Sequence, residues 1–288
     1  KEGRIHAHIN QIRSDSGGTV TGRFSYNHPN LQQIPSRGQF AQDIRKIFIP
    51  ETGEYWLKAD YSQQEPRLLT HFARLVDQPG SGEVQKAYLE KDLDFHQQTA
   101  DMAGVQRSLA KTIGLGVMYG MGYHKLAREL DMEPQEAKTM LQDFHAKVPF
   151  MKGMLEAVMN RANSKGVIRT LLGRKCRFDL WEPTQWGVHK ALPLNQAQTE
   201  YGMAIKRAYT YKALNRLIQG SAADQTKKAM VDVYEEMGII PLIQVHDELD
   251  CSVKSEIEAQ KIKKIMENCI ELEVPSKVDI NLGESWGE

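Results

Sequence analysis

The sequence predicts an α+β fold in which a helical segment is inserted between the two halves of one sheet. Both ends of the chain contain short runs of alternating apolar and polar residues, the pattern typical of strands. Between them, from Glu83 to about Ala213, apolar residues recur almost throughout at helical spacing. Strand groups separated in this way indicate a single sheet formed by both ends of the chain, with the helices as a subdomain.

The elements of the N-terminal part are predicted from alternation, turn residues and helical spacing. Stretches rich in Gly, Pro and Asn predict the turns and loops between the alternating strands. Pro66 fits a helix in its first turn, where a missing N–H is tolerated. The predicted elements are a strand at 4–12, a turn at 15–18, a second strand at 19–26, a loop at 27–36, a strand from 54 that ends at Asp60, and a helix at 63–76.

The C-terminal part is predicted to return to the sheet. A long helix is predicted to stop at Gly238, because glycine readily adopts the left-handed conformation that is common at helix ends. The predicted elements are a helix at 216–238, a strand at 239–245, a tight turn at 246–248, a strand at 249–253, a helix at 256–272 and a strand at 278–285. The predicted division is therefore a first sheet part at 1–67, a helical part at 68–205 and a second sheet part at 206–288.

Composition excludes several classes of protein. The 288 residues are 41% hydrophobic and 26% charged, which excludes a disordered or collagen-like chain. No long apolar run and no basic leader before an apolar stretch appear, so neither a transmembrane helix nor a signal peptide is expected. Three widely spaced cysteines, Cys176, Cys251 and Cys269, fit a reducing cytoplasm rather than a disulfide framework. Lys1 in place of an initiating Met indicates a processed chain, an excised domain or an incomplete gene.

The charges are equal in number but unevenly distributed. Lys and Arg total 37, as do Asp and Glu. Residues 161–228 carry 13 basic and 4 acidic side chains, whereas residues 229–288 carry 5 basic and 14 acidic ones. A basic segment can neutralise nucleic-acid phosphates, and an acidic segment can hold cations. On charge alone, two solvated helix faces remain the simpler explanation.

Two aspartates are candidate metal ligands. Asp60 ends a strand, and Asp247 lies in the turn between two strands. Carboxylates at adjacent strand ends repel each other unless cations bind between them, and oxygen ligands without a His/Cys cluster favour Mg²⁺ or Mn²⁺. Two such ions about 3.5–4 Å apart support an in-line displacement at phosphorus. Taken alone, each aspartate is more simply an ordinary turn residue.

A helix in the middle of the chain is a candidate phosphate-binding element. At 100° per residue, the residues sharing one of its faces are Arg107, Lys111, Gly114, Leu115 and Met118. Two cations one turn apart suit a polyphosphate, and the apolar surface beyond them suits a flat base. A helix end packed on the core, with its cations at the surface, is an equal alternative.

Three motifs in this order resemble motifs A, B and C of the family A DNA polymerases. They are DYSQQEPR at 60–67, RSLAKTIGLGVMYG at 107–120 and QVHDELD at 244–250. The resemblance runs nearly from end to end of the chain, with matching order and spacing. It implies a right-hand polymerase with an antiparallel-sheet palm at 1–67 and 206–288 and a helical fingers subdomain at 68–205. A thumb is not apparent, and nothing resembles the 3′–5′ exonuclease domain that precedes this region in the family.

The resemblance implies a catalytic centre of carboxylates and cations. Asp60, Asp247 and the backbone carbonyl of Tyr61 would bind two Mg²⁺ ions, for which Mn²⁺ can substitute, with Glu248 as an auxiliary catalytic acid. Lys111 would protonate the departing pyrophosphate. The residues implied to bind the nucleotide are Arg107, Lys111, His96, Leu115, Tyr119, Glu65, Gln63 and Tyr61.

The resemblance also implies residues for sugar choice and for DNA. Glu65 would crowd the sugar 2′ position and exclude ribonucleotides, braced by Tyr119, which also closes the templating site. Donors directed at minor-groove acceptors, which every correct pair presents, test geometry without reading sequence. The residues implied to contact DNA are Arg23, Asn30, Gln33, Asn215, Gln219 and His246.

Four positions depart from the family pattern. Gln64 replaces a common aliphatic residue, and Pro66 follows the sugar-gate glutamate. Gly114 stands where Asn is frequent, and Leu115 stands where Phe or Tyr usually stacks on the incoming nucleotide. Such a leucine resembles certain phage enzymes and indicates a viral origin, with a place in the host cytoplasm. These changes bear on sugar discrimination and fidelity rather than on the metal chemistry.

The expected function is template-directed DNA synthesis from dNTPs and a primer, with release of pyrophosphate. A single-subunit RNA polymerase is an alternative, because such enzymes share the palm and its carboxylates. Glu65, as a residue that would exclude ribonucleotides, weighs against this alternative. A non-catalytic DNA-binding replication module is the alternative from another class, and the carboxylate pair weighs against that. The expected partners are primer–template DNA and dNTPs, with thumb, exonuclease or replisome components beyond this chain and no membrane.

Overall fold

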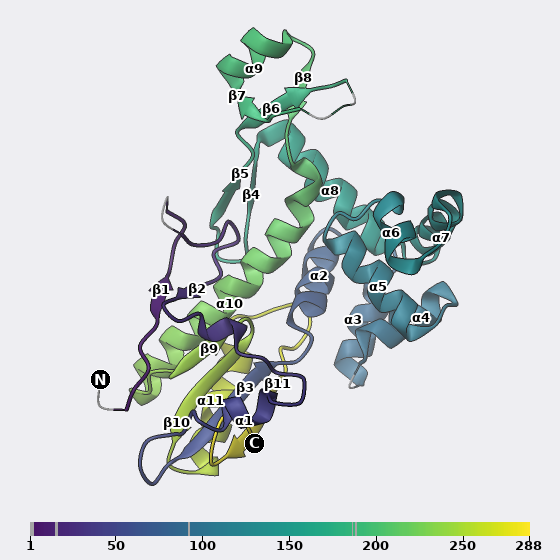
Figure 1. Ribbon diagram of the computed structural model, residues 1–288. Helices are drawn as coiled ribbons and strands as arrows, with labels where there is room; N and C mark the ends of the chain where they lie inside the picture. Colours follow the sequence, from purple (N-terminus) through teal and green to yellow (C-terminus); the bar gives the residue numbers. More distant parts are fainter. Residues whose placement is uncertain (1–2, 15–16, 92, 186, 188) are drawn as a thin grey trace. The chain divides into compact units, whose positions relative to one another are not determined.

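The computed structural model describes residues 3–14, 17–91, 93–185, 187 and 189–288 (Figure 1). The chain folds into two units, Lys1–Leu68 with Gln219–Glu288, and Leu69–Ile218. The helix α10 (Ala213–Met237) crosses the second of these boundaries, which therefore falls inside a helix rather than in a linker. That the two units are a palm and a fingers subdomain stays a prediction.

A four-stranded antiparallel sheet forms the centre of the first unit, in the order β11-β3-β10-β9. Its strands are β3 (Tyr55–Tyr61), β9 (Ile243–Val245), β10 (Glu248–Val253) and β11 (Val278–Gly283). Only β3 comes from the N-terminal part, and it pairs with both β10 and β11. The prediction of one sheet built from both ends of the chain is therefore confirmed.

The two faces of this sheet differ sharply because side chains alternate along each strand. One face is apolar and packs on α10 and on α11 (Glu256–Asn268). The buried residues of this core include Leu57, Ala59, Leu249, Cys251, Val278, Ala229, Val233, Ala259 and Ile262. The register places Asp60, Glu248 and Asp279 on the opposite face, so the acidic residues are separated from the apolar core.

The N-terminal elements of the first unit are shorter than the alternation predicted. The strands are β1 (His8–Asn10) and β2 (Ser25–Asn27), which pair antiparallel, and the 3-10 helix η1 (Leu31–Gln33) and α1 (Ala41–Arg45) follow. Residues 15–16 of the predicted turn lie outside the described residues. A second apolar cluster joins this part to the sheet through Tyr26, Leu31, Trp56, Ile243 and Trp286.

The second unit is mainly helical. Its helices are the end of α2 (Gln64–Leu75), then α3 (Ser81–Glu90), α4 (Phe95–Ala103), α5 (Arg107–Met118), α6 (Tyr123–Leu130), α7 (Pro134–Lys147) and α8 (Pro149–Lys165). Buried residues such as Phe95, Ile113 and Phe150 form their core. Within the described residues, no helix of the chain is long and apolar enough to cross a membrane.

The prediction of nearly continuous helix up to Ala213 is wrong for the described residues of 167–207, except for the helix at 194–201. This segment contains β4 (Val167–Arg169), β5 (Lys175–Arg177), β6 (Leu180–Pro183), β7 (Leu192–Pro193), α9 (Leu194–Tyr201) and β8 (Ile205–Arg207), followed by η2 (Thr210–Lys212). Gly166 ends α8 with a φ of 68°, and Gly173 turns the following hairpin with a φ of 83°. Between them the residues alternate in burial, which is the strand pattern.

Candidate active site

Four carboxylates gather at one end of the sheet of the first unit. Asp60 lies near the end of β3, directly opposite Glu248 of β10 on one side and Asp279 of β11 on the other. Asp247 lies in the two-residue turn between β9 and β10, and its carbonyl accepts a hydrogen bond from the Tyr61 N–H at 3.2 Å. The structure thus brings Asp60, Asp247 and Glu248 together as predicted and adds Asp279, which the sequence analysis missed.

Crowding of these carboxylates changes their acidity. Desolvation, together with the negative charges of Asp247, Glu248 and Asp279, raises the pKa of Asp60 to about 7. Asp60 as a whole residue is exposed, although packed neighbours surround its carboxyl group. Like charges directly opposite each other on a sheet repel, which favours the neutral form of the Asp60 carboxyl. Desolvation also raises the pKa of Asp247, against the lowering influence of Arg23 and His246.

This site fits a divalent cation by the chemistry of its donors. Within the described residues, no group of three or more His, Cys, Asp or Glu side chains is arranged as a ready metal cage. The donors are oxygen atoms that repel one another, which Mg²⁺ would relieve. Tyr61 is held firmly, because its buried hydroxyl donates to the Met266 carbonyl at 2.7 Å. Its backbone N–H donates to the Asp247 carbonyl, so the main chain of Tyr61 is held next to that of Asp247.

Two tryptophans donate hydrogen bonds to carboxylates on the acidic face of the sheet. The Trp286 indole N–H donates to Glu248 Oε1 at 3.1 Å, and the Trp56 indole N–H donates to Asp250 Oδ1 at 2.9 Å. The two indoles stack with their centroids 6.2 Å apart. Asp250 is fully buried, and desolvation followed by the charge of Glu248 raises its pKa well above the ordinary value. The alternation of β10 could have indicated Asp250, since it shares the face of Glu248.

Glu65 and Arg23 form an ion pair. Their Oε1 and Nη2 atoms are 2.8 Å apart, and both side chains are largely shielded from solvent. Glu65 lies in the first turn of α2, after Gln63, which has a positive φ of 54°. The structure therefore couples the residue predicted to select the sugar to a residue predicted to contact DNA. The predicted contact of Glu65 with Tyr119 joins different units and stays a prediction.

Gln64 is buried and occupies the position where the family pattern has an aliphatic residue. Its amide Nε2 donates to the Ala222 carbonyl at 3.3 Å and to Gln225 Oε1 and Thr226 Oγ1, each at 3.2 Å. Its Oε1 is buried without a hydrogen-bond partner in the described part of the chain. Gln64 thus fixes the start of α2 against α10 by hydrogen bonds instead of apolar packing.

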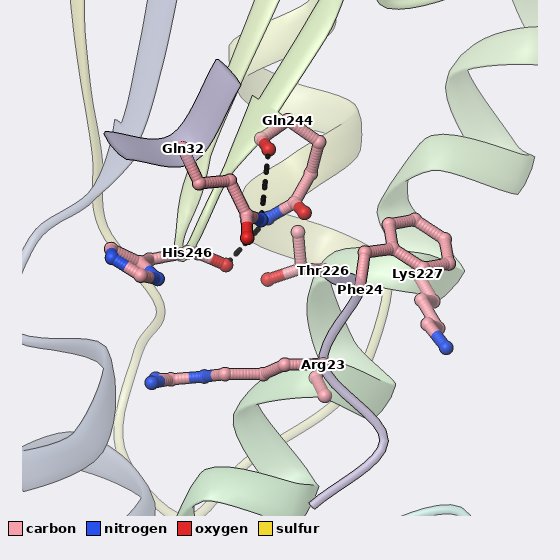
Figure 2. A pocket seen from close by; sticks show the side chains of 8 residues that line it. Arg23, Phe24, Gln32, Thr226, Lys227, Gln244 and His246 are labelled. Carbon is pink, nitrogen blue, oxygen red and sulfur yellow. Dashed lines mark hydrogen bonds between the residues drawn. The ribbon is translucent and has the colours of Figure 1, made fainter. Parts of the chain in front are cut away.

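Arg23 and His246 line one pocket, which Figure 2 shows from close by. Within it, Gln32 Nε2 donates to the Gln244 carbonyl at 3.3 Å, and Gln244 Nε2 donates to the His246 carbonyl at 2.6 Å. His246 is held in the turn with a positive φ of 56°. The remaining lining residues are Phe24, Ala223, Thr226 and Lys227. Neither Gln32 nor Gln244 was predicted to belong to a site, although Gln244 is the first residue of the third motif.

The other residues predicted to contact DNA are placed separately. Asn30 caps the 3-10 helix η1, because its side chain accepts from the Gln32 N–H at 3.1 Å. Gln33 ends the same helix and is exposed. Asn215 and Gln219 lie one turn apart on α10, so they share a helix face. Their joint contact with a nucleic acid stays a prediction.

In the second unit, α5 carries the predicted phosphate-binding cations. Arg107, its first residue, pairs with Asp94 at 2.7 Å, and Asp94 also caps α4. Hydrogen bonds from Arg107 and the backbone outweigh partial burial and lower the pKa of Asp94. Lys111 is exposed one turn later. Burial, then the charge of Lys111, lowers the pKa of His96, whose Nδ1 is buried without a hydrogen-bond partner among the described residues.

The apolar part of the predicted α5 face is largely internal. Gly114 is buried, with the Met151 methyl 3.6 Å from the place of a Cβ atom, and Met118 is 1% exposed. The expectation that both belong to an open nucleotide-facing surface is therefore wrong, because α5 turns this stripe onto the helical core. Leu115 is half-buried and Tyr119 is 42% exposed, so these two remain the accessible candidates.

Comparisons with known proteins agree with these features. The chain is 39% identical to the DNA-directed DNA polymerase of Pseudomonas phage M6, over 99% of this chain and 47% of that protein. It is 34% identical to the thermostable DNA polymerase I of Thermus aquaticus, over 99% of this chain and 33% of that protein. The chain thus spans between a third and a half of the length of these relatives.

A solved structure is similar over nearly the whole chain. The POL domain of Pol1 from M. smegmatis, in complex with DNA primer–template and dNTP, matches with a TM-score of 0.78 and 30% identity, covering 99% of this chain and 48% of that one. The α+β arrangement with small antiparallel sheets is therefore that of a polymerase fold. The sequence profile described as DNA polymerase family A matches residues 1–288. The chain belongs to DNA polymerase family A.

Proposed function

We propose that this protein catalyses template-directed DNA synthesis, adding dNTPs to a primer 3′-hydroxyl with release of pyrophosphate. The observation that carries the proposal is the acidic end of the sheet, where Asp60, Asp247 and Glu248 lie together. Membership of DNA polymerase family A supports it, as does the likeness to a domain solved with primer–template and dNTP. In this proposal the first unit is the palm and the second unit the fingers.

The first step is assembly of the metal-binding centre. Asp60, Asp247 and the carbonyl of Tyr61 would hold two Mg²⁺ ions, or Mn²⁺ in their place. When bound, these ions would supply activation of the attacking hydroxyl and neutralisation of the leaving phosphate. Glu248, held by Trp286 at 3.1 Å, assists from the neighbouring strand without being a required ligand.

Cations of the second unit would bind the triphosphate. Arg107 and Lys111 lie one turn apart at the start of α5, the spacing that suits a polyphosphate. Lys111 would give its proton to the departing pyrophosphate, and the neutral ring of His96 would donate a hydrogen bond to the β-phosphate side. Leu115 and Tyr119 would contact the base, while Gln63 lies beside the sugar-selecting Glu65.

The DNA would be read by shape rather than by sequence. Arg23 and His246, which line one pocket, would donate to minor-groove acceptors of the terminal pairs. Asn30, Gln33, Asn215 and Gln219 would extend this contact along primer and template. A phage origin and a place in the host cytoplasm fit the likeness to a phage enzyme, and a thumb or exonuclease domain beyond this chain would complete the enzyme.

Primer extension with Mg²⁺, comparing dNTPs with rNTPs, tests the proposal. DNA synthesis is expected with dNTPs only, and Asp247→Asn should abolish it while leaving primer–template affinity within about twofold, because a neutral amide lacks the negative charge that a carboxylate offers to the cations. Preferential use of rNTPs would favour a single-subunit RNA polymerase. DNA binding without any extension would favour a non-catalytic replication module.

A further inference from the structure

A hairpin in the second unit carries an unusual arrangement of like charges. Strands β4 and β5 pair antiparallel, with Arg169 directly opposite Lys175. Two cations facing each other across a strand pair are destabilising. Arg177 lies two residues after Lys175 on β5 and therefore on the same face, and the side chains of Arg169, Lys175 and Arg177 are all exposed. The hairpin therefore concentrates positive charge on one face at the expense of its own stability.

The opposite face of the hairpin fixes this orientation. Ile168 is 2% exposed and Cys176 is 5% exposed, so each strand contributes one residue to the core. The turn is closed by the Gly173 N–H, which donates to the Thr170 carbonyl at 2.9 Å, and by Arg169 Nη1, which donates to the Gly173 carbonyl at 3.1 Å. The charged face cannot rotate inward without exposing the apolar residues, so it faces solvent permanently.

Negative charge close to the hairpin is scarce. Residues 161–181 carry six basic residues and one acidic residue, Asp179. In the described part of the chain, none of Arg169, Lys175 and Arg177 forms an ion pair with a carboxylate. A further guanidinium adjoins them, since Arg216 Nη1 donates to the Arg177 carbonyl at 3.2 Å.

Not every cation of this region is part of the same surface. Arg207 donates to the carbonyls of Asn163, at 3.2 Å, and Phe178, at 2.8 Å, and its guanidinium stacks on Trp181 at 4.6 Å. Arg207 therefore acts as a structural link between the strands and α8. Lys86 and Lys152 each lie 3.8 Å from a glutamate one turn ahead, so their charges are locally balanced. Lys175 and Arg177 differ from both kinds, whereas Arg169 combines its outward charge with one hydrogen bond to the turn.

We propose that the outward face of the β4–β5 hairpin binds the phosphate backbone of DNA through Arg169, Lys175 and Arg177. The inference rests on the proposed function, which supplies DNA as the polyanion. Phosphates between Arg169 and Lys175 convert their mutual repulsion into two attractions, and release of counterions drives the association. The contact carries no sequence information, because phosphates are the same at every base.

DNA affinity across a salt series tests this contact. The double variant Lys175→Gln/Arg177→Gln should bind a primer–template about tenfold more weakly at low salt, and the slope of log affinity against log salt should become shallower by roughly two. The matched control Lys86→Gln/Lys152→Gln removes the same charge and should change affinity less than twofold. The rate of nucleotide addition at saturating DNA should stay within about twofold of the parent for both.

Thermal stability separates a binding role from a structural one. Lys175→Gln alone removes the opposed pair, so its Tm should equal or exceed that of the parent while its DNA affinity falls. A lower Tm with an unchanged salt slope would overturn the proposal, because the cations would then serve the fold. Parental affinity and slope in the double variant would overturn it as well.

Affinity measurements with single-stranded and with duplex DNA show which part of the primer–template the hairpin contacts. A loss confined to single-stranded template identifies the template, and an equal loss on blunt duplex identifies the duplex. A loss of binding to polyglutamate with none on DNA would overturn the assignment in favour of an acidic protein. A parent chain that binds DNA without extending it contradicts the proposed function but leaves the hairpin test readable, whereas a parent that binds no DNA contradicts both.

Discussion

Asp60 lies where the sheet is least favourable for a charge. Its neighbours on both adjacent strands are carboxylates, and the pKa of about 7 expresses how strongly the folded protein resists ionising it. An ionised carboxylate at this position lowers the stability of the folded protein, and groups with strongly shifted pKa values of this kind are common at functional sites. Arg169 and Lys175 repeat the arrangement with the opposite sign, and in each case a ligand of opposite charge would relieve the repulsion.

Replacing Asp60 by Asn should stabilise the metal-free protein at alkaline pH. The folded pKa is raised above the ordinary value of 3.8, so the folded state retains a proton that the unfolded state loses, and stability falls as pH rises from about 4 to 7. After discounting for the exposure of Asp60, we expect Asp60→Asn to gain about 1–2 kcal/mol in free energy of unfolding at pH 8.

Urea unfolding in EDTA at pH 4 and pH 8 measures this difference. Asp60→Asn should match the parent near pH 4, where both side chains are neutral, and should lose primer extension at every pH. Equal stability of variant and parent at pH 8 would show that the neighbouring carboxylates do not act on Asp60.

Arg23 is expected to hold the sugar-selecting residue in place. Because Glu65 and Arg23 pair at 2.8 Å, Arg23→Ala removes the ion pair that holds the Glu65 carboxylate in this position. The variant should incorporate ribonucleotides at least about tenfold more readily relative to dNTPs, corresponding to roughly 1.4 kcal/mol of lost discrimination. Competition between dNTP and rNTP in single-nucleotide addition measures it. A uniform loss for both sugars, without a change in their ratio, would assign Arg23 to DNA binding alone.

At the scale of elements, the glycines that follow α5 have different reasons to be there. Gly120 has a φ of 71°, and a Cβ atom there would lie 2.5 Å from the Tyr211 carbonyl oxygen. Gly122, two residues later, has an ordinary φ of -88° and open space around it. Only the first is demanded by the connection between α5 and α6.

Gly120→Ala should therefore destabilise the protein far more than Gly122→Ala. The left-handed backbone accounts for about 1 kcal/mol and the collision with a backbone oxygen for more, so we expect a loss of roughly 2–3 kcal/mol. Gly122 is the N-cap of α6, where glycine is favoured over alanine, so the control should lose about 0.5–1 kcal/mol. Chemical unfolding followed by circular dichroism distinguishes them. Equal losses would mean that the α5–α6 connection adapts to a side chain at either place.

Sequence patterns predicted long or strictly alternating elements and failed on short ones. Helix α10 ends at Met237 with Gly238 after it, and β3 spans Tyr55–Tyr61, both close to the expectation. The strands between Gly166 and Ala208 were not predicted, because strands of two to four residues show too little alternation to outweigh a helical context. Burial was the other limit. Spacing placed Gly114 and Met118 beside Lys111, but could not show that packing against Met151 turns them inward.

Contacts between distant residues were the least predictable part of the site. The two aspartates were identified from motifs, whereas Asp279 and Trp286 entered through strand register and packing from the end of the chain. Likewise, the ion pair of Arg23 with Glu65 joins residues that no local pattern connects. Local motifs therefore predicted the candidate reacting groups, and only the fold showed which residues hold them.

Charge at the scale of the whole molecule is divided between the two units. Residues 69–218 carry 21 basic and 15 acidic side chains, and the remaining residues carry 16 basic and 22 acidic ones. The first unit thus has the sign that suits cations, and the second has the sign that suits phosphates. The formal net charge of zero is therefore the sum of an acidic first unit and a basic second unit, which would attract cations and phosphates respectively.

DNA binding should therefore depend steeply on salt even though the protein has a pI near 7.3. Each phosphate neutralised contributes about -0.9 to the slope of log affinity against log salt, so three hairpin contacts alone predict a slope near -3, with the contacts of the first unit adding to it. Fluorescence anisotropy with a labelled primer–template between 50 mM and 300 mM NaCl measures the slope. A slope near zero would mean that local charge does not govern association. A slope in Lys175→Gln/Arg177→Gln as steep as that of the parent would place the phosphate contacts outside the hairpin.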